Sequence, residues 1–145
     1  MEFRTISDNK RAFLPLLLLG DEQEDMIARY LGRGTLWALY DGGLRCVCVV
    51  TEEGEGVFEI KNLAVEPESQ RRGYGRAMVE HVARQCRGSR LLVGTGDSPL
   101  TIPFYEACGF REHHRVRNFF TDHYDHPIFE AGRRLVDMVV LERPL

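Results

Sequence analysis

The chain of 145 residues has the length of one domain, and its 43% hydrophobic and 28% charged residues are typical of a folded globular protein rather than a disordered or fibrous one. The net charge is only −3, which argues against a nucleic-acid binder because such proteins usually carry a basic excess. Residues 70–145 nevertheless carry a net charge of +3 against −6 for residues 1–69, and a positive half of this kind suits a small anionic ligand.

Three elements are predicted in the first 31 residues. Residues 2–6 are typical of an edge strand, and Asn9 suits the N-cap of a helix that runs to Leu19. A second, amphipathic helix is predicted over residues 22–31, because its apolar side chains recur at helical spacing. These side chains are Met26, Ile27, Tyr30 and Leu31.

The apolar run over residues 13–19 follows two basic residues, as the core of a signal peptide would. It is too short to cross a membrane, which takes roughly 20 apolar residues. An acidic segment follows it at once, with no small-residue cleavage site. We therefore interpret the run as a buried helix, and we expect a cytoplasmic protein with no membrane partner.

The hydrophobic period changes after residue 34, where three strands are predicted. They span residues 35–40, 44–51 and 57–65. The first turn, Asp41-Gly42-Gly43, is a strong hairpin signal, and the second is polar and contains glycine. This part of the chain is therefore expected to form an antiparallel meander.

A helix is predicted after a turn rich in glycine and arginine. Its buried face comprises Gly75, Met78, Val79, Val82, Ala83 and Cys86. Gly88 suits its C-cap. A short buried strand over residues 90–94 comes next, followed by a helix that is capped by Asp97 or Ser98 and runs to Cys108.

The last third is predicted to contain a charged strand within residues 110–120, an aromatic loop over 121–132 and a final strand over 135–143. A strand–helix–strand unit over residues 57–94 implies a parallel pair at the centre of the sheet. The predicted fold is α/β (α+β), with a mixed, mostly antiparallel central sheet flanked by helices. We expect residues 1–145 to form a single domain.

The four cysteines are predicted to be reduced and buried. Cys46 and Cys48 are two apart in an apolar strand, Cys86 and Cys108 fall in predicted helices, and no C-x-x-C pair occurs. The adjacent pair His113-His114 lacks spaced partners, so no metal site is expected.

Residues 57–76 are the most informative stretch, because a strand runs there into a turn, rich in glycine and arginine, that opens a helix. Backbone N–H groups at a helix start are unpaired, and the helix dipole is positive there. Gly73 and Gly75 leave these amides open to a phosphate, and Arg71, Arg72 and Arg76 add positive charge. A pyrophosphate would suit this turn. The alternative is a glycine turn that only packs a helix closely on the sheet. Neither the dinucleotide fingerprint nor the P-loop pattern is present.

Three motifs in order make the signal more specific. Residues 70–75 (Gln-Arg-Arg-Gly-Tyr-Gly) resemble the Gln/Arg-x-x-Gly-x-Gly/Ala signature of the GNAT superfamily of N-acetyltransferases. Residues 63–67 (Leu-Ala-Val-Glu-Pro) resemble the strand and turn before that signature. Residues 102–110 (Ile-Pro-Phe-Tyr-Glu-Ala-Cys-Gly-Phe) resemble the Phe-Tyr-Glu-x-x-Gly-Phe segment of the same family. The resemblance is good over about residues 35–120, and the predicted element order fits the whole chain.

The resemblance implies the acyl-CoA N-acyltransferase fold, with a parallel pair that splays apart. It also implies acetyl-CoA as donor and a primary amine of a small molecule or peptide as acceptor, attacking directly in a ternary complex. The residues that would hold the donor are Leu63, Ala64, Val65, Gln70, Arg71, Arg72, Gly73, Tyr74, Gly75 and Arg76. The Leu63 amide would polarise the thioester carbonyl. Many relatives carry Asn after the strand at 91–95, whereas this chain has Gly96-Asp97-Ser98, so Ser98 is the candidate replacement.

Two side chains are candidates for proton transfer. Tyr105 matches the family's usual acid, which would protonate the departing thiolate of CoA; the alternative is a core tyrosine beside Phe104. Glu59 lies fourteen residues before Gly73, the spacing of the catalytic glutamate in the histone-acetyltransferase branch, and is the candidate base. The alternative is an ion pair with Lys61. Because an extended strand places Glu59 roughly 13 Å from Leu63, a basic role needs a water relay.

The acceptor site is expected across the sheet from the donor, near the first two predicted helices and the 118–132 segment. Residues 118–127 of this segment are rich in aromatic and acidic side chains. Carboxylates attract a cation and rings hold it by cation–π contact. The candidates are Phe119, Asp122, Tyr124 and Asp125. The alternative is an aromatic loop that covers the sheet edge.

Two other functions remain open from the sequence. One is a non-catalytic acyl-CoA-binding sensor or subunit, and the other is a nucleotide-binding module of another family. Association into a homodimer is also left open.

Overall fold

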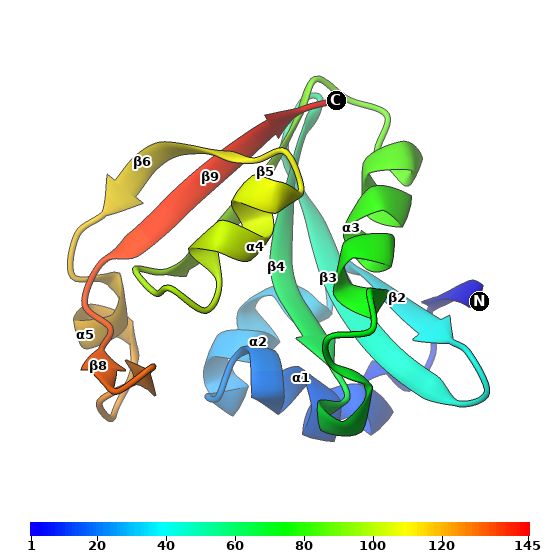
Figure 1. Ribbon diagram of the computed structural model, residues 1–145, viewed down its shortest axis with the longest axis horizontal. Helices are drawn as coiled ribbons and strands as arrows, with labels where there is room; N and C mark the ends of the chain where they lie inside the picture. The colour runs from blue at the N-terminus through cyan, green and yellow to red at the C-terminus, as the bar shows by residue number, and fades with distance from the viewer.

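A seven-stranded sheet forms the centre of the computed structural model, which describes residues 1–145 (Figure 1). Its strand order is β1-β2-β3-β4-β5-β9-β6. The strands are β1 (Glu2–Ile6), β2 (Thr35–Tyr40), β3 (Leu44–Gly54), β4 (Val57–Val65), β5 (Arg90–Gly96), β9 (Met138–Pro144) and β6 (Arg111–Val116). All neighbours are antiparallel except β4 and β5. The structure thus confirms the predicted mixed sheet with one parallel pair.

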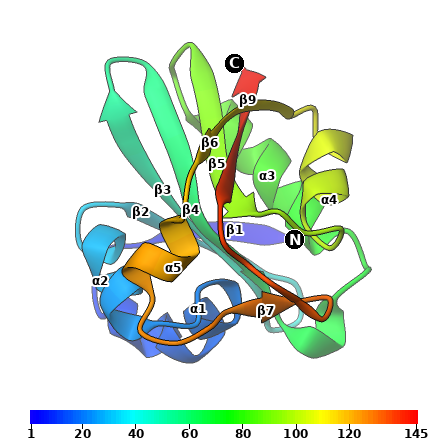
Figure 2. The same cartoon turned by 90° about the vertical axis from the view of Figure 1, so that its left-hand side faces the viewer.

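Helices cover both faces of the sheet. Figure 2 shows α1 (Leu14–Gly20) and α2 (Glu24–Leu31) on one side, and α3 (Tyr74–Gln85) and α4 (Ile102–Ala107) on the other. Each side has its own apolar cluster, and the larger one lies beneath α3 and α4. The apolar run at 13–19 becomes α1 after a 3-10 turn at Lys10–Phe13, and its buried face is made by Leu16 and Leu17.

The parallel pair separates partway along its length. β4 pairs with β5 only from Val57 to Ile60, and the rest of β4 has no partner on that edge. A β-bulge falls at Lys61, because Ile60 opposes Val50 and Asn62 opposes Val49. The bulge turns Ile60 and Asn62 to opposite faces, so that Ile60 packs beneath α3 while Asn62 donates to the Leu17 carbonyl of α1 at 2.9 Å.

Several predicted helix ends are wrong. Asn9 precedes the first helix but makes no side-chain cap and adopts a left-handed conformation. The helix after the glycine turn ends at Gln85, because Cys86 is extended. Gly88 is therefore not a cap. It is required instead because a Cβ there would lie 2.4 Å from the Gly56 carbonyl oxygen. The helix expected to start at 97–98 begins at Ile102.

The C-terminal third differs most from the prediction. The strand predicted within 110–120 ends at Val116, and α5 (Phe119–His123) follows it. Asn118 ends the extended run with φ +58°, and its N–H donates to the Asp137 carboxylate at 2.9 Å. The expected loop also contains a small hairpin, β7 (Phe129–Glu130) and β8 (Arg133–Arg134).

The four cysteines are free thiols, and all but the half-buried Cys86 are buried. None of the helices combines the length and apolar character that a membrane crossing requires. No group of three or more His, Cys, Asp or Glu side chains is arranged to hold a metal ion.

Candidate active site

The turn before α3 presents a row of unpaired backbone donors. None of the amides of residues 71–76 donates to a carbonyl or side chain of the chain. Arg71 and Gly73 hold positive φ angles of 63° and 85°, which direct the chain into the first turn of α3. The unpaired amides and the positive end of the helix dipole make this turn a site for an anion.

A cavity of about 560 Å³ opens beside this turn, between α3, α4 and the unpaired half of β4. It gathers nine of the predicted site residues, namely Leu63, Val65, Gln70, Arg71, Gly73, Tyr74, Gly75, Arg76 and Tyr105. The lining also includes side chains that the sequence analysis did not single out, namely Leu100, Thr101, Phe104, Ala107 and Cys108. All five lie in α4 or within two residues of its ends.

Three residues predicted to hold the donor do not line this cavity. Ala64 is buried against the opposite helix layer, because neighbouring residues of a strand alternate between faces. The guanidinium of Arg72 is exposed and lies 5.5 Å from the centre of the Tyr74 ring. Ser98 is buried, and its hydroxyl accepts the Leu100 N–H at 3.1 Å in the turn that leads to α4. Each of these side chains contacts another part of the chain instead of the cavity.

The space over the turn fits a pyrophosphate. A Cβ built at Gly73 would meet no heavy atom within 4 Å, so the amides beside it face open space. A Cβ at Gly75 would instead lie 3.2 Å from the Phe104 ring, which packs α4 against the start of α3. Gly73 thus leaves room for a ligand, and Gly75 allows the two helices to approach.

Tyr105 belongs both to the core and to the cavity wall. It is 8% exposed, and its ring contacts Phe104 and Phe110 edge-on at centroid distances of 5.1 and 5.7 Å. Its hydroxyl has no hydrogen-bond partner within the chain. Burial is the main cause that raises the pKa of this phenol well above its usual range. The hydroxyl therefore stays protonated at neutral pH, as a proton donor must.

Glu59 lies in an ion pair. Its carboxylate is 2.7 Å from Lys61 Nζ, which is also 3.5 Å from the Glu53 carboxylate. Glu59 lies where β4 still pairs with β5, and it lines neither of the two cavities described here. The ion pair that was the alternative interpretation is therefore present, and a role as base still requires a water relay.

A second cavity of about 400 Å³ lies on the other side of the sheet, between α1, α2, the ends of β4 and β5, and the segment that carries α5 and β7. Phe119 and Tyr124, two of the four acceptor candidates, line it. Asp122 and Asp125 do not, because both carboxylates point to solvent. The carboxylates that do line the cavity are Asp21, Glu22 and Glu130. No local pattern marks them, since they come from the end of α1 and from a hairpin.

Asp21 links the segment that carries Tyr124 to the first two helices. It accepts hydrogen bonds from the Tyr124 hydroxyl at 2.6 Å and the Tyr30 hydroxyl at 2.8 Å. The Tyr30 hydroxyl in turn accepts from the Asn62 amide at 3.1 Å. Burial raises the pKa of Asp21, while the two tyrosine hydrogen bonds act against the rise. This network fixes the orientation of the Tyr124 ring in the cavity wall.

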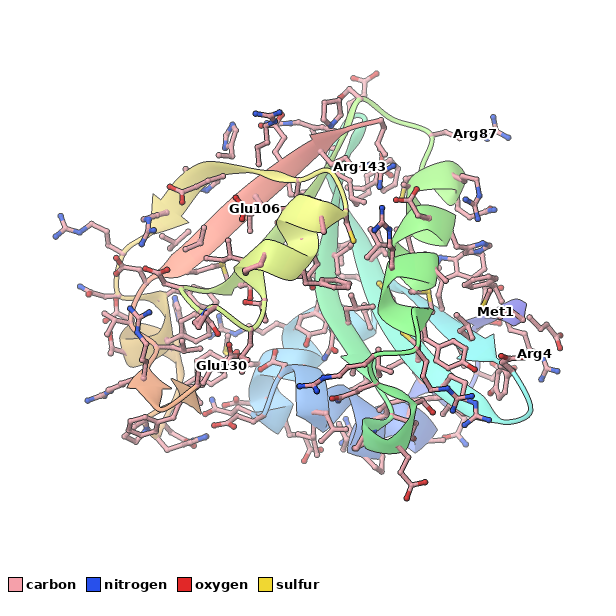
Figure 3. The ribbon with its side chains drawn as sticks, viewed as in Figure 1. Met1, Arg4, Arg87, Glu106, Glu130 and Arg143 are labelled. Carbon is pink, nitrogen blue, oxygen red and sulfur yellow. The ribbon has the colours of Figure 1, made fainter.

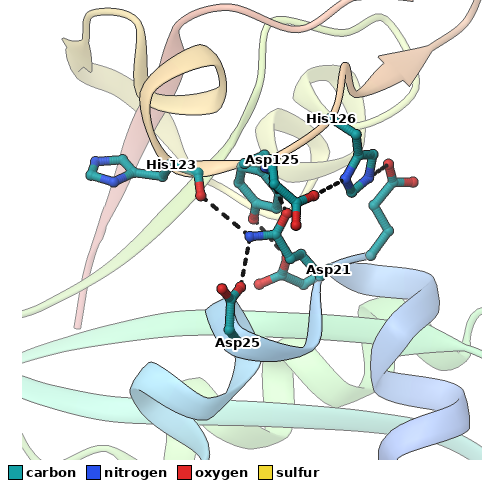
Figure 4. A network of polar contacts seen from close by, with 8 residues as sticks. Asp21, Asp25, His123, Asp125 and His126 are labelled. Atoms are coloured by element: carbon teal, nitrogen blue, oxygen red, sulfur yellow. Dashed lines mark hydrogen bonds and ion pairs between the residues drawn. The ribbon is translucent and has the colours of Figure 1, made fainter.

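Gln23 makes a second connection between the same segments (Figure 4). Its amide nitrogen donates to Asp25 at 2.6 Å and to the His123 carbonyl at 3.3 Å, and its amide oxygen accepts the Asp125 N–H at 2.9 Å. Gln23 itself is buried, whereas its three partners belong to exposed residues. Residues about 100 positions apart in the chain thus form one wall.

His126 closes the outer side of this network. Its Nδ1 lies 2.6 Å from Asp125 and its Nε2 lies 2.9 Å from Glu22 (Figure 4). Only the imidazolium form donates both of these hydrogen bonds. The bond to Asp125, followed by the bond to Glu22, raises the pKa of His126.

The link through His126 is expected to stabilise the fold at acidic and neutral pH. Because its folded pKa is raised, its contribution is complete below the ordinary value of about 6.5 and disappears as pH rises through the folded pKa. We predict that His126→Gln lowers the Tm at pH 6 and that the difference from wild type vanishes at pH 9. Thermal unfolding at both pH values is the measurement. An equal difference at both would show that the charge of His126 is not involved.

The two cavities lie on opposite sides of the place where β4 and β5 separate. Thr95 lines the second cavity and Thr101 the first, and their hydroxyls are hydrogen-bonded at 2.8 Å. On β4, Lys61 lines the second cavity and Leu63 the first. A ligand that reaches through this gap from one cavity would therefore contact a ligand bound in the other.

Comparisons with known proteins agree with this arrangement. The family model for the acetyltransferase (GNAT) domain matches residues 32–112. Uncharacterized N-acetyltransferase YvbK of Bacillus subtilis (strain 168) is 35% identical over an alignment of 131 residues that covers 87% of this chain and 84% of that protein. The structure of IAA acetyltransferase from Bacillus cereus ATCC 14579 covers 99% of both chains, with 33% identity and a TM-score of 0.92. A GNAT family acetyltransferase from Elizabethkingia anophelis, solved with acetyl-CoA bound, shares 30% identity over 99% of this chain and 97% of its own, with a TM-score of 0.92.

Proposed function

Since this chain belongs to the GNAT family of acetyltransferases, it is an acetyl-CoA-dependent acyltransferase, and we propose that it acetylates a primary amine of a small molecule or peptide by direct attack in a ternary complex. The observation that carries the proposal is the placement of two cavities on opposite sides of the gap between β4 and β5. One cavity has an anion-binding turn for the donor, and the other has an acidic and aromatic wall for the acceptor.

The donor side is assigned to the first cavity. Acetyl-CoA supplies a thioester whose carbonyl carbon is open to attack by an amine. The unpaired amides of residues 71–76 would bind its pyrophosphate, with Arg71 and Arg76 adding charge. The free edge of β4 from Leu63 to Val65 would pair with the extended pantetheine, and the Leu63 amide would polarise the carbonyl oxygen.

The transfer requires two proton movements. The amine nitrogen forms a bond to the acetyl carbon as the carbon–sulfur bond breaks, so one proton leaves the nitrogen and one is added to sulfur. Tyr105 is assigned as the donor to sulfur, because its protonated hydroxyl lines the donor cavity without an internal partner. A water molecule would take the amine proton, and Glu59 would act on that water from its place beside Lys61.

Tyr124 is assigned to the acceptor side, and its removal tests that assignment. Tyr124→Ala deletes a ring from the cavity wall and the hydrogen bond to Asp21. We predict that the KM for the amine rises by about tenfold, as expected for a lost aromatic contact. The KM for acetyl-CoA should not change, since this ring lies on the other side of the sheet. An unchanged KM for the amine would mean that the segment only covers the sheet edge.

Thiol release is the experiment that tests the function itself. Purified protein is incubated with acetyl-CoA and a panel of primary amines, and free CoA thiol is measured against a sample without amine. An amine-dependent release is the expected result. A protein that binds acetyl-CoA, shown by a raised Tm, but releases no thiol with any amine would be an acyl-CoA-binding sensor or subunit.

A further inference from the structure

Glu130 carries a buried carboxylate oxygen with no partner. Its Oε2 is shielded from solvent and accepts no hydrogen bond. Glu130 ends β7 just before the turn at Ala131 and Gly132, whose φ angles of 51° and 74° return the chain to β8. Figure 3 shows Glu130 on the inner side of this hairpin, and the residue lines the second cavity. A buried anionic oxygen without a donor is costly, so it indicates a bond that a ligand completes.

The other acidic side chains of this cavity are already used within the chain. Asp21 accepts hydrogen bonds from two tyrosine hydroxyls. Glu22 lies 2.9 Å from the His126 ring. Glu130 is thus the one carboxylate of the cavity wall whose buried oxygen is free to bind a cation.

The basic side chains of the wall do not neutralise Glu130. Arg33 and Lys61 both contact Glu53, at 2.8 and 3.5 Å, and Lys61 also contacts Glu59. Arg29 is exposed and makes no ion pair within the chain. No basic side chain of the wall thus forms an ion pair with Glu130, and a cationic occupant of the cavity would supply the balancing charge.

The rest of the wall favours a flat apolar group. Phe119, Phe120 and Tyr124 form a continuous aromatic cluster, with centroid distances of 5.3 Å from Phe119 to Phe120 and 5.5 Å from Phe120 to Tyr124. Ile128 and Leu135 extend this surface from the side of the hairpin. Rings of this kind stack on another ring or on an alkyl chain.

Glu130 also lies close enough to the donor side to influence it. Burial is the main cause that raises the pKa of Tyr105, and the carboxylate of Glu130 adds to the rise after three cysteine thiols. A group bound to Glu130 would lie in the cavity that Thr95 also lines, and the Thr95 hydroxyl is hydrogen-bonded at 2.8 Å to Thr101, which lines the first cavity together with Tyr105.

We propose that Glu130 anchors the amino group of the acceptor and that the aromatic wall selects a primary amine on a ring-sized apolar body. The inference rests on the proposed function, because it places the acceptor in the second cavity. Glu130 is here a binding residue, which holds the nitrogen next to the gap between β4 and β5.

The test uses 2-phenylethylamine as the probe and 2-phenylethanol as its counterpart without the amino group. Binding of each is measured by calorimetry in the presence of CoA, for wild type and Glu130→Gln. The variant should bind the amine about tenfold to a hundredfold more weakly, as expected for a lost bond to a charged group. The alcohol should bind both proteins equally. In turnover, the KM for the amine should rise while the KM for acetyl-CoA does not.

Two controls make the result specific. Glu55→Gln removes an exposed carboxylate on the turn before β4, where it makes no ion pair, and should behave as wild type. Glu130→Gln should unfold at no lower a temperature than wild type, because the replaced oxygen has no bond to lose. Equal amine binding by wild type and Glu130→Gln, or wild-type binding of the alcohol as tight as the amine, would overturn the inference. Glu130-dependent binding without thiol release would instead contradict the proposed function alone.

Discussion

Replacing Tyr105 by phenylalanine is expected to lower kcat by about a hundredfold to ten-thousandfold, the usual effect of losing a general acid. The KM for acetyl-CoA should change little, because the ring and its contacts with Phe104 and Phe110 are kept. Only the hydroxyl is lost, and it has no internal partner, so the Tm should stay within a few degrees of wild type. The measurement is steady-state turnover under conditions in which the chemical step limits the rate.

The matched control for this substitution is Tyr40→Phe, which removes a hydroxyl from β2, outside both cavities. It should keep wild-type turnover. If Tyr105→Phe also keeps wild-type turnover, Tyr105 serves only to pack α4 against the sheet, and the departing thiolate takes its proton from elsewhere.

The turn with unpaired amides and the free edge of β4 beside the first cavity could be predicted from the sequence because their signals are local. Most of the residues predicted to hold the donor fall in one short stretch, residues 63–76. The glycines and arginines of the turn indicate an anion site without any knowledge of tertiary contacts. The limit of this reasoning is shown by Ser98. Its place in the sequence suggested a contact with the donor, but its hydroxyl is bonded to the Leu100 amide within a turn.

The wall of the second cavity, the proposed acceptor site, could be predicted only in part, because it is built from distant segments. The aromatic run around Phe119 and Tyr124 was visible, whereas the choice between inward and outward carboxylates depended on a helix and a hairpin that have no clear period in the sequence. Asp125 points to solvent beside His126, while Glu130 points inward. Asp21 becomes part of the site only because Tyr124 folds back on it.

The β-bulge at Lys61 also could not be predicted from the sequence. Strict alternation along 57–65 would place Glu59 and Leu63 on one face, but the extra residue turns Leu63 toward the donor cavity. Such a bulge depends on how β4 pairs with β3, and the hydrophobic pattern of one strand does not reveal that pairing.

Replacing Gly73 by valine is expected to weaken acetyl-CoA binding by about tenfold to a hundredfold, the effect of losing one hydrogen bond to a charged group. Gly73 holds φ +85°, a conformation that β-branched residues rarely adopt, and its Cβ would project into the open space beside the unpaired amides. Both effects disturb the position of the unpaired amides or block access to them. Arg71→Ala only removes an exposed charge, whose contribution to binding is usually below about 1 kcal/mol. Gly73→Val should therefore bind acetyl-CoA several-fold more weakly than Arg71→Ala, as measured by calorimetry. Equal losses in the two variants would mean that side-chain charge, rather than the backbone of the turn, holds the pyrophosphate.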